Sequence, residues 1–162
     1  MDKIEFSPIG IIYSPFKEKA GMPIQPVSGA GIKGKIEVFD KYVEGLKDIE
    51  EFSHIILLYH FHLSEKGYNL QTKPFLEDKK HGVFSIRGPR RPNPIGLSIV
   101  KLTSREKNIL NIENLDILDG TPLFDIKPYI ESFDTQKNVI SGWTEKHKKK
   151  VKDKKSDARF GG

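Results

Sequence analysis

The stretch of sequence at 81–102 constrains the fold more than any other part of this chain. It reads HGVFSIRGPRRPNPIGLSIVKL, with the β-branched and aromatic residues typical of strands towards both of its ends. Its centre contains Pro89, Pro92 and Pro94, and each proline fixes φ, lacks an N–H group and favours extended geometry in the residue before it. A helix is therefore excluded, and the pattern predicts two strands joined by a stiff turn.

This stiff turn also carries several side-chain hydrogen-bond donors. Arg87, Arg90 and Arg91 lie within it, and Asn93 follows them. A rigid backbone that presents several donors is suited to binding an anionic or polar ligand. The same residues also fit an exposed basic hairpin whose prolines protect its edge from further strand pairing. The spacing alone is compatible with both interpretations.

The remaining apolar residues occur in short runs, which indicates further strands and little helix. We expect these strands at 3–13, 35–39, 52–63, 109–117 and 124–130. Helical turns are expected at 41–51 and at 141–153, where Trp143 is the apolar anchor. Because strands and helices do not alternate, the sequence predicts an all-β, mainly antiparallel fold: a single-sheet barrel of six to seven strands with short helical insertions and a basic C-terminal helix or tail.

One glycine motif suggests a nucleotide-binding fold of another kind. Residues 29–34, GAGIKG, match the pattern G-x-G-x-x-G of dinucleotide-binding proteins. That pattern must follow a strand and open a helix, whereas here it ends a proline-rich loop at 14–31 and leads into the strand expected at 35–39. We therefore reject a Rossmann site, and we expect the long loop itself to have a functional role.

The net charge of +5 is concentrated at one end of the chain. Residues 144–162 contain eight basic and three acidic side chains, and the rest of the chain contains 19 of each. We therefore divide the chain into a barrel domain at 1–143 and a basic segment at 144–162. A basic segment predicts a polyanionic partner, with Lys149 and Lys150 among its contacts, although it would also suit a solubilising tail.

Composition also limits the chemistry and the compartment. The absence of cysteine excludes disulfides, thiolate metal sites and a cysteine nucleophile. His54, His60 and His62 share one strand face, but no carboxylate follows them at ligand spacing, so we expect no metal site. No apolar run approaches the roughly 20 residues of a membrane span, and no signal peptide is visible, so we expect a cytoplasmic protein without membrane contact.

Four blocks of the sequence, taken in order, resemble the TrmO family (YaeB-like, VirR-like) of S-adenosylmethionine-dependent tRNA adenine N6-methyltransferases. The most specific block is R-x-P-x-R-P-N-P-I-G-x-S at 87–98. The others are IGIIYSPFKEKAGMPIQP at 9–26, FSHIILLYHFH at 52–62 and LDILDGTPLFDIKPY at 115–129. The resemblance covers nearly the whole chain and implies a single β-barrel that forms a homodimer and uses S-adenosyl-L-methionine.

The resemblance also implies which residues bind the cofactor. Arg87 is a candidate for its carboxylate or ribose side, Leu97 and Leu115 for the walls around its adenine, and Asn114 and Asp116 for the polar edges of that ring. Further contacts are implied in the long loop and at the end of the strand at 52–63. These are Gln25, Pro26, Val27, His62, Leu63 and Ser64.

The substrate implied by the resemblance is the adenosine at position 37 of a tRNA, beside the anticodon, which already carries a threonylcarbamoyl group. Arg90, Arg91 and Lys127 are candidates to bind the carboxylate of that group. Asp125 and Tyr129 are the expected catalytic residues on the substrate side, with Asn93 as a further one, because methylation of an amine depends on positioning. Two alternatives stay open: a non-catalytic RNA-binding barrel, and a methyltransferase with another substrate.

Overall fold

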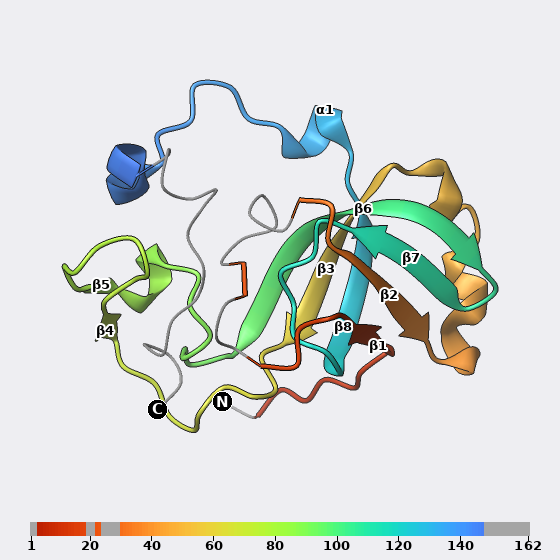
Figure 1. Ribbon diagram of the computed structural model, residues 1–162, viewed down its shortest axis with the longest axis horizontal. Helices are drawn as coiled ribbons and strands as arrows, with labels where there is room; N and C mark the ends of the chain where they lie inside the picture. The colour runs from red at the N-terminus through yellow and green to blue at the C-terminus, as the bar shows by residue number, and fades with distance from the viewer. Residues whose placement is uncertain (1–2, 19–21, 24–29, 148–162) are drawn as a thin grey trace.

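The computed structural model describes residues 3–18, 22–23 and 30–147, and in them six antiparallel strands close into a barrel (Figure 1). The order around the barrel is β1, β2, β7, β6, β3 and β8. These strands are β1 (Gly10–Tyr13), β2 (Lys33–Val38), β3 (His54–His60), β6 (Ile95–Glu106), β7 (Ile109–Glu113) and β8 (Thr121–Pro128). The predicted fold class, an antiparallel barrel of six to seven strands, is confirmed.

The barrel interior is filled by every second residue of each strand. Alternate residues of a strand point to opposite faces, so a closed sheet buries one of the two sets. In β3 the buried set is Ile55, Leu57 and Tyr59, and in β6 it includes Val100 and Leu102. The outward sets of β3 and β6 also contain apolar residues, Ile56 and Leu97 among them, so the sequence of these two strands does not by itself distinguish the inward face.

The chain between β3 and β6 leaves the barrel as an insertion, residues 61–94. It carries a separate two-stranded sheet of β4 (Gln71–Thr72) and β5 (His81–Gly82), followed by the 3-10 turn η4 (Val83–Ser85). In Figure 1 this sheet lies to one side of the barrel. The prediction of a strand–turn–strand hairpin at 81–102 is therefore wrong in its first half. Of the apolar residues there, Val83 and Ile86 are buried and Phe84 is exposed, and none of the three pairs with β6.

Several other predicted elements have different bounds. The strand expected at 3–13 begins only at Gly10. Pro8, shortly before it, lacks the N–H group that a strand residue donates to a neighbouring strand. The strand expected at 109–117 ends at Glu113, because Asn114 adopts a left-handed φ of 67°. The strand expected at 124–130 starts earlier, at Thr121, and ends at Pro128.

The helical segments are short. They are the 3-10 helices η2 (Asp40–Leu46), η3 (Ile49–Glu51) and η5 (Gly142–His147), and the single-turn helix α1 (Glu131–Asp134). The helix expected at 141–153 is thus a 3-10 helix as far as His147, and its remainder lies outside the described residues. None of the helices in the described part is long and apolar enough to cross a membrane.

A glycine is required where β6 passes the ring of Tyr59. Gly96 is opposite Tyr59 in the β3–β6 register, and a Cβ at Gly96 would lie 2.2 Å from a ring carbon. We expect Gly96→Ala to lower the free energy of unfolding by about 1–3 kcal/mol, the usual cost of overpacking. Urea unfolding of the variant and the wild type measures this difference.

Gly45→Ala is the matched control for that substitution. Gly45 lies in η2, and an added Cβ there meets no atom within 4 Å. Its stability should be unchanged or slightly raised, because alanine restricts the unfolded chain. Equal unfolding midpoints for the two variants would contradict a close approach at Gly96.

Candidate functional site

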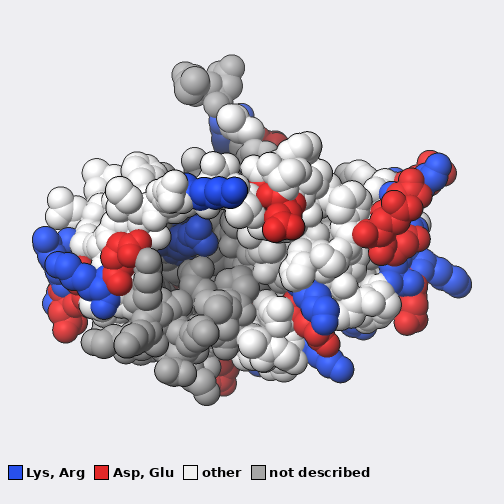
Figure 2. All heavy atoms as spheres, turned by 90° about the horizontal axis from the view of Figure 1, so that it is seen from above, with Lys and Arg blue, Asp and Glu red and all other residues white. Residues whose placement is uncertain are grey.

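A cavity of about 860 Å³ lies at one mouth of the barrel, where β3 ends and β6 begins. Its walls come from five parts of the chain: residues 22–23, the barrel mouth, the insertion, the segment 116–121 after β7, and the segment 141–144 at η5. Seen from above, the molecule is hollowed between the insertion and the barrel, and blue Lys or Arg atoms lie in the wall of the hollow (Figure 2). The cavity therefore joins elements that are far apart in the sequence.

Three polar side chains form a hydrogen-bonded chain on the barrel side of this cavity. Ser98 donates its hydroxyl proton to Asp116 Oδ1 at 2.7 Å, and the Tyr59 hydroxyl lies 3.0 Å from the same Ser98 oxygen. Tyr59 and Ser98 are 4% and 1% exposed. Polar groups this deeply buried are stable only when they are paired, so the chain of contacts fixes all three side chains.

Burial changes the acidity of two members of this network. It raises the pKa of Asp116 to about 6, an effect opposed by the Ser98 hydrogen bond, the residue's own backbone and the positive charge of Arg87. The pKa of Tyr59 is also raised, first by burial and then by the negative charge of Asp116, so the phenol stays protonated. Asp116 is thus a carboxylate that would gain from a hydrogen-bond donor or a positive charge in the cavity.

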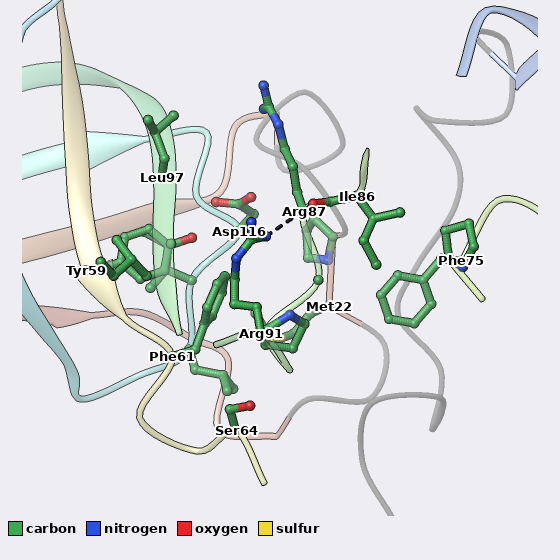
Figure 3. A pocket seen from close by; sticks show the side chains of 18 of the residues that line it. Met22, Tyr59, Phe61, Ser64, Phe75, Ile86, Arg87, Arg91, Leu97 and Asp116 are labelled. Carbon is green, nitrogen blue, oxygen red and sulfur yellow. Dashed lines mark hydrogen bonds between the residues drawn. The ribbon is translucent and has the colours of Figure 1, made fainter. Parts of the chain in front are cut away.

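Two of the predicted arginines line the cavity. Arg91 donates from Nη1 to the Ile86 carbonyl at 3.1 Å, and this bond fixes its side chain against the insertion. Figure 3 shows Arg87, Arg91 and Asp116 between the barrel residues Tyr59 and Leu97 and the insertion residues Ile86 and Phe75. Arg90 instead pairs with Glu65 at 2.9 Å and does not line the cavity.

The end of β3 contributes another part of the wall. His62, Leu63 and Ser64 all line the cavity, and His62 Nδ1 lies 3.3 Å from Thr121 Oγ1. The pKa of His62 is lowered, chiefly because burial penalises the charged ring and also because His60 is close. The imidazole is therefore neutral near pH 7 and leaves positive charge in the cavity to the arginines.

The structure brings seven of the predicted site residues together around the cavity. They are His62, Leu63, Ser64, Arg87, Arg91, Leu97 and Asp116. Five more lie outside the described residues: Gln25, Pro26, Val27, Lys149 and Lys150. With Met22 and Pro23 also in its lining, the cavity brings together residues of all four blocks of sequence.

Two predicted cofactor contacts, Asn114 and Leu115, do not line the cavity. Leu115 is fully buried in the barrel core, so it does not face the cavity as the predicted adenine wall would require. Asn114 accepts a hydrogen bond from the Gly31 amide at 3.0 Å and turns the chain with its left-handed φ. Both residues therefore support the segment that carries Asp116.

The four other predicted residues do not line the cavity. Asp125 and Lys127 form an ion pair of 2.8 Å on the outer surface of β8, and the Tyr129 hydroxyl lies 3.0 Å from Thr135 Oγ1. Asn93 is exposed in the turn before β6. Within one chain, the expected catalytic side chains are thus separate from the cavity.

Sequence reasoning missed Tyr59 and Ser98 as site residues. The signal for Ser98 is its place at an inward position of β6, where its inward neighbours further along the strand are Val100 and Leu102. A serine in such an apolar series requires a buried partner. Among the described residues, no group of three or more His, Asp or Glu side chains is arranged to hold a metal ion.

The fold and the cavity define a β-barrel protein with a ligand site at the barrel mouth, an architecture distinct from doubly wound nucleotide-binding folds. The family model of the tRNA-methyltransferase O N-terminal domain matches residues 11–135. The chain belongs to this family. The family predicted from the four sequence blocks is confirmed, and with it the class of S-adenosylmethionine-dependent tRNA methyltransferases.

Three relatives illustrate the similarity. A probable S-adenosyl-L-methionine-binding protein of Pyrococcus abyssi is 55% identical over 155 residues, 96% of this chain and 84% of the relative. A tRNA (adenine(37)-N6)-methyltransferase of Mus musculus is 40% identical over 82% of this chain and 32% of its own length. The crystal structure of TrmO from Pseudomonas aeruginosa superposes with a TM-score of 0.73 at 35% identity, over 88% of this chain and 63% of that chain. This chain therefore spans less than two thirds of the mouse protein and of the solved structure.

Replacing Asp116 with asparagine tests the burial of this carboxyl. Its pKa of about 6 in the folded state, against an ordinary 3.8, means that the folded state binds more protons between those pH values. The free energy of unfolding therefore falls as pH rises through this interval. We expect Asp116→Asn to remove that decline and to raise the stability of the ligand-free protein at neutral pH by about 1–3 kcal/mol, as measured by urea unfolding across the interval.

Asp119→Asn is a control of opposite sign. Hydrogen bonds, first from Lys17 and then from the Ser14 amide, lower the pKa of Asp119 below its ordinary value. Its ionised form therefore stabilises the fold above that ordinary value, and this contribution is lost as pH falls through the lowered pKa. If Asp116→Asn instead lowers stability at neutral pH as Asp119→Asn should, the assigned cost of ionising Asp116 is wrong.

Proposed function

We propose that this chain transfers the methyl group of S-adenosylmethionine to the N6 amine of adenosine 37 in a tRNA that carries a threonylcarbamoyl group at that base. The observation that carries the proposal is the cavity, in which Arg87 and Arg91 face the same space as the Asp116 network. Family membership supports the reaction class, and the mouse relative's name supports the position of the base. The threonylcarbamoyl requirement rests on the resemblance and on the chemistry of the cavity.

The residues around the cavity fit the cofactor. Its volume, about 860 Å³, is near the upper end of the range of about 300–1,000 Å³ that is typical of small-molecule sites. Arg87 would hold the carboxylate, Asp116 would accept hydrogen bonds from the ribose or the adenine amine, and Leu97 would contact the adenine face. We propose that Gln25, Pro26 and Val27 complete this site, as the sequence predicts.

S-adenosylmethionine supplies a methyl group that its sulfonium charge already activates. The N6 lone pair of adenine is delocalised into the ring, so the protein's main task is to position the amine and exclude water. The buried phenol of Tyr59 and the aliphatic side chains of Ile117 and Leu118 provide a wall of low polarity at the barrel mouth. Arginines on the opposite side would fix the charged ends of both reactants.

The carboxylate of a threonylcarbamoyl group requires a cation of its own. Arg91 is the best placed of the three candidates, because it lines the cavity with its guanidinium held by a carbonyl. Arg90 and Lys127 are each engaged by an acidic side chain at the surface. We therefore assign substrate recognition inside the cavity to Arg91 and leave the other two to contacts with the surrounding RNA.

A homodimer would bring the outlying catalytic candidates to the cavity. Ile95, Leu97 and Ile99 are 39%, 50% and 39% exposed along the outer face of β6, and the first two also line the cavity. Leu58 pairs with Leu97 on one side and with Asp125 on the other, so Asp125 shares this outward face. We propose that a second copy covers the face and places Asp125 and Tyr129 at a cavity edge. Light scattering that finds a fully active monomer would exclude this.

The basic segment at 144–162 would contribute contacts of another kind. Its lysines, Lys149 and Lys150 among them, can neutralise phosphates without reading sequence. We propose that it steers tRNA to a barrel domain that is itself close to neutral, and that the reaction takes place in the cytoplasm. The salt dependence of tRNA binding measures this contribution.

The test is a methyl-transfer assay with tRNA prepared with and without its threonylcarbamoyl group. We expect transfer to the N6 amine only when the group is present. Arg87→Ala should weaken binding of S-adenosylhomocysteine by about 1.5–3 kcal/mol if the guanidinium holds a charged group, as measured by calorimetry. Lys79→Ala is a control with the same change of charge on the insertion, away from the cavity, and should bind normally.

Two outcomes distinguish the alternatives. A protein that binds tRNA but gives no heat with the cofactor would be the non-catalytic RNA-binding barrel. Equal transfer to modified and unmodified tRNA would show a methyltransferase with a broader substrate, and the assignment of Arg91 would then be wrong.

A further inference from the structure

Trp143 is the one tryptophan of the chain, and its side chain forms part of the cavity wall. It belongs to η5, which reaches the cavity from beyond β8 and α1 along a long connection (Figure 1). Its indole N–H donates to the Ser85 carbonyl at 2.8 Å, so the ring is tied by its edge to the insertion. A residue from outside the barrel is thereby held in a defined orientation at the site.

The indole ring of Trp143 is also supported by a cluster of three other side chains. His81 stacks on the indole with ring centroids 4.6 Å apart and an angle of 20° between the planes. Glu77 accepts hydrogen bonds from Nε2 of both His81 and His147, the latter at 3.1 Å. These two bonds lower the pKa of Glu77, that from His81 most, so the carboxylate stays ionised.

The three side chains of this cluster lie beside Trp143 but outside the cavity. His81, His147 and Glu77 do not line the cavity, whereas Trp143 and Ser85 do. Both histidine side chains are only 14% exposed, so the contacts are shielded from water. A flat aromatic ring that is fixed on its edge and on one face, and presented to a cavity, is a preorganised surface for stacking.

The cavity has two ends of different chemistry. The barrel end contains the Asp116 network and suits the hydroxyls and amines of a cofactor. At the other end are aromatic and aliphatic side chains of the insertion, Phe75 and Ile86 among them, and the two arginines lie between the ends (Figure 3). A purine needs an aromatic face rather than charge, so the insertion end suits a second, uncharged ring.

We propose that Trp143 is the stacking surface for the adenine that is to be methylated, and that Glu77 positions it through His81 and His147. The base would leave the anticodon loop and lie on the indole, with its N6 substituent directed to the arginines between the two ends. This inference rests on the proposed function and names the part of the site that holds the substrate base.

The fluorescence of the single tryptophan provides a direct test. Stacking of a base on the indole should quench its emission, whereas a ligand confined to the barrel end should leave the emission unchanged. We expect threonylcarbamoyl-modified tRNA to quench Trp143 in the presence of S-adenosylhomocysteine, and S-adenosylhomocysteine alone not to do so. Quenching by S-adenosylhomocysteine alone would assign the indole to the cofactor and overturn the proposal.

Kinetics of variants test the same contact in the catalytic reaction. Trp143→Ala should raise the KM for modified tRNA about tenfold or more, because a base–aromatic stack is lost, while the affinity for S-adenosylhomocysteine stays the same. Trp143→Phe retains a ring and should restore most of the loss. Tyr68→Ala removes an exposed ring of the insertion outside the cavity and should change neither quantity.

Glu77→Gln tests the positioning role separately. It removes the negative charge shared by the two histidines without altering the cavity wall. We expect greater acrylamide quenching of Trp143 and a higher KM for tRNA, with unchanged affinity for S-adenosylhomocysteine. Wild-type acrylamide quenching in this variant would show that Glu77 does not position the indole.

Failure of this inference can be told from failure of the proposed function. If the wild-type protein methylates modified tRNA but Trp143→Ala keeps the wild-type KM, the stacking role is wrong and the function stands. If Phe84→Ala raises the KM in place of Trp143→Ala, the base stacks on the exposed ring of Phe84 at the cavity rim instead. If no variant or wild-type protein transfers methyl groups, the proposed function itself fails.

Discussion

The hydrogen-bonded chain from Tyr59 through Ser98 to Asp116 is the interaction on which the site depends. It links adjacent strands β3 and β6 to the segment after β7, at the mouth of a barrel whose interior is mostly apolar. Burial of these polar groups is unfavourable unless every partner is present, so the mouth has one stable arrangement. The cavity can therefore be preorganised without a ligand.

The barrel supplies rigidity, and the chain outside it supplies most of the ligand-facing surface. A closed sheet has no unpaired edges, so all six strands are satisfied within the domain. The cavity-lining arginines Arg87 and Arg91, by contrast, come from the proline-rich end of the insertion, and Trp143 comes from η5. The site thus combines a stable support with two extra-barrel segments that are fixed to one another by the Ser85 and His81 contacts.

The sequence was sufficient to predict the barrel, because its apolar residues occur in short runs rich in β-branched and aromatic residues, and strands do not alternate with helices. The sequence blocks also indicated Arg87 and Asp116 as site residues, and both line the cavity. The sequence failed for Val83, where a β-branched residue in a tight turn has the same local signature as one in a strand. Nor could it place Trp143 beside His81, because that contact depends on where a connection far along the chain returns.

The neck of the insertion has a consequence for how this family can vary. His60 and Ile95, the residues at its two ends, are paired in the β3–β6 register, and the Phe61 amide donates to the Pro94 carbonyl at 2.9 Å. The insertion therefore leaves and re-enters the sheet at a single point, like a long hairpin loop closed at its base. An insertion of this kind can be lengthened, shortened or exchanged at a small entropic cost, while β3 and β6 keep their pairing. New substrate preferences can thus evolve on an unchanged barrel.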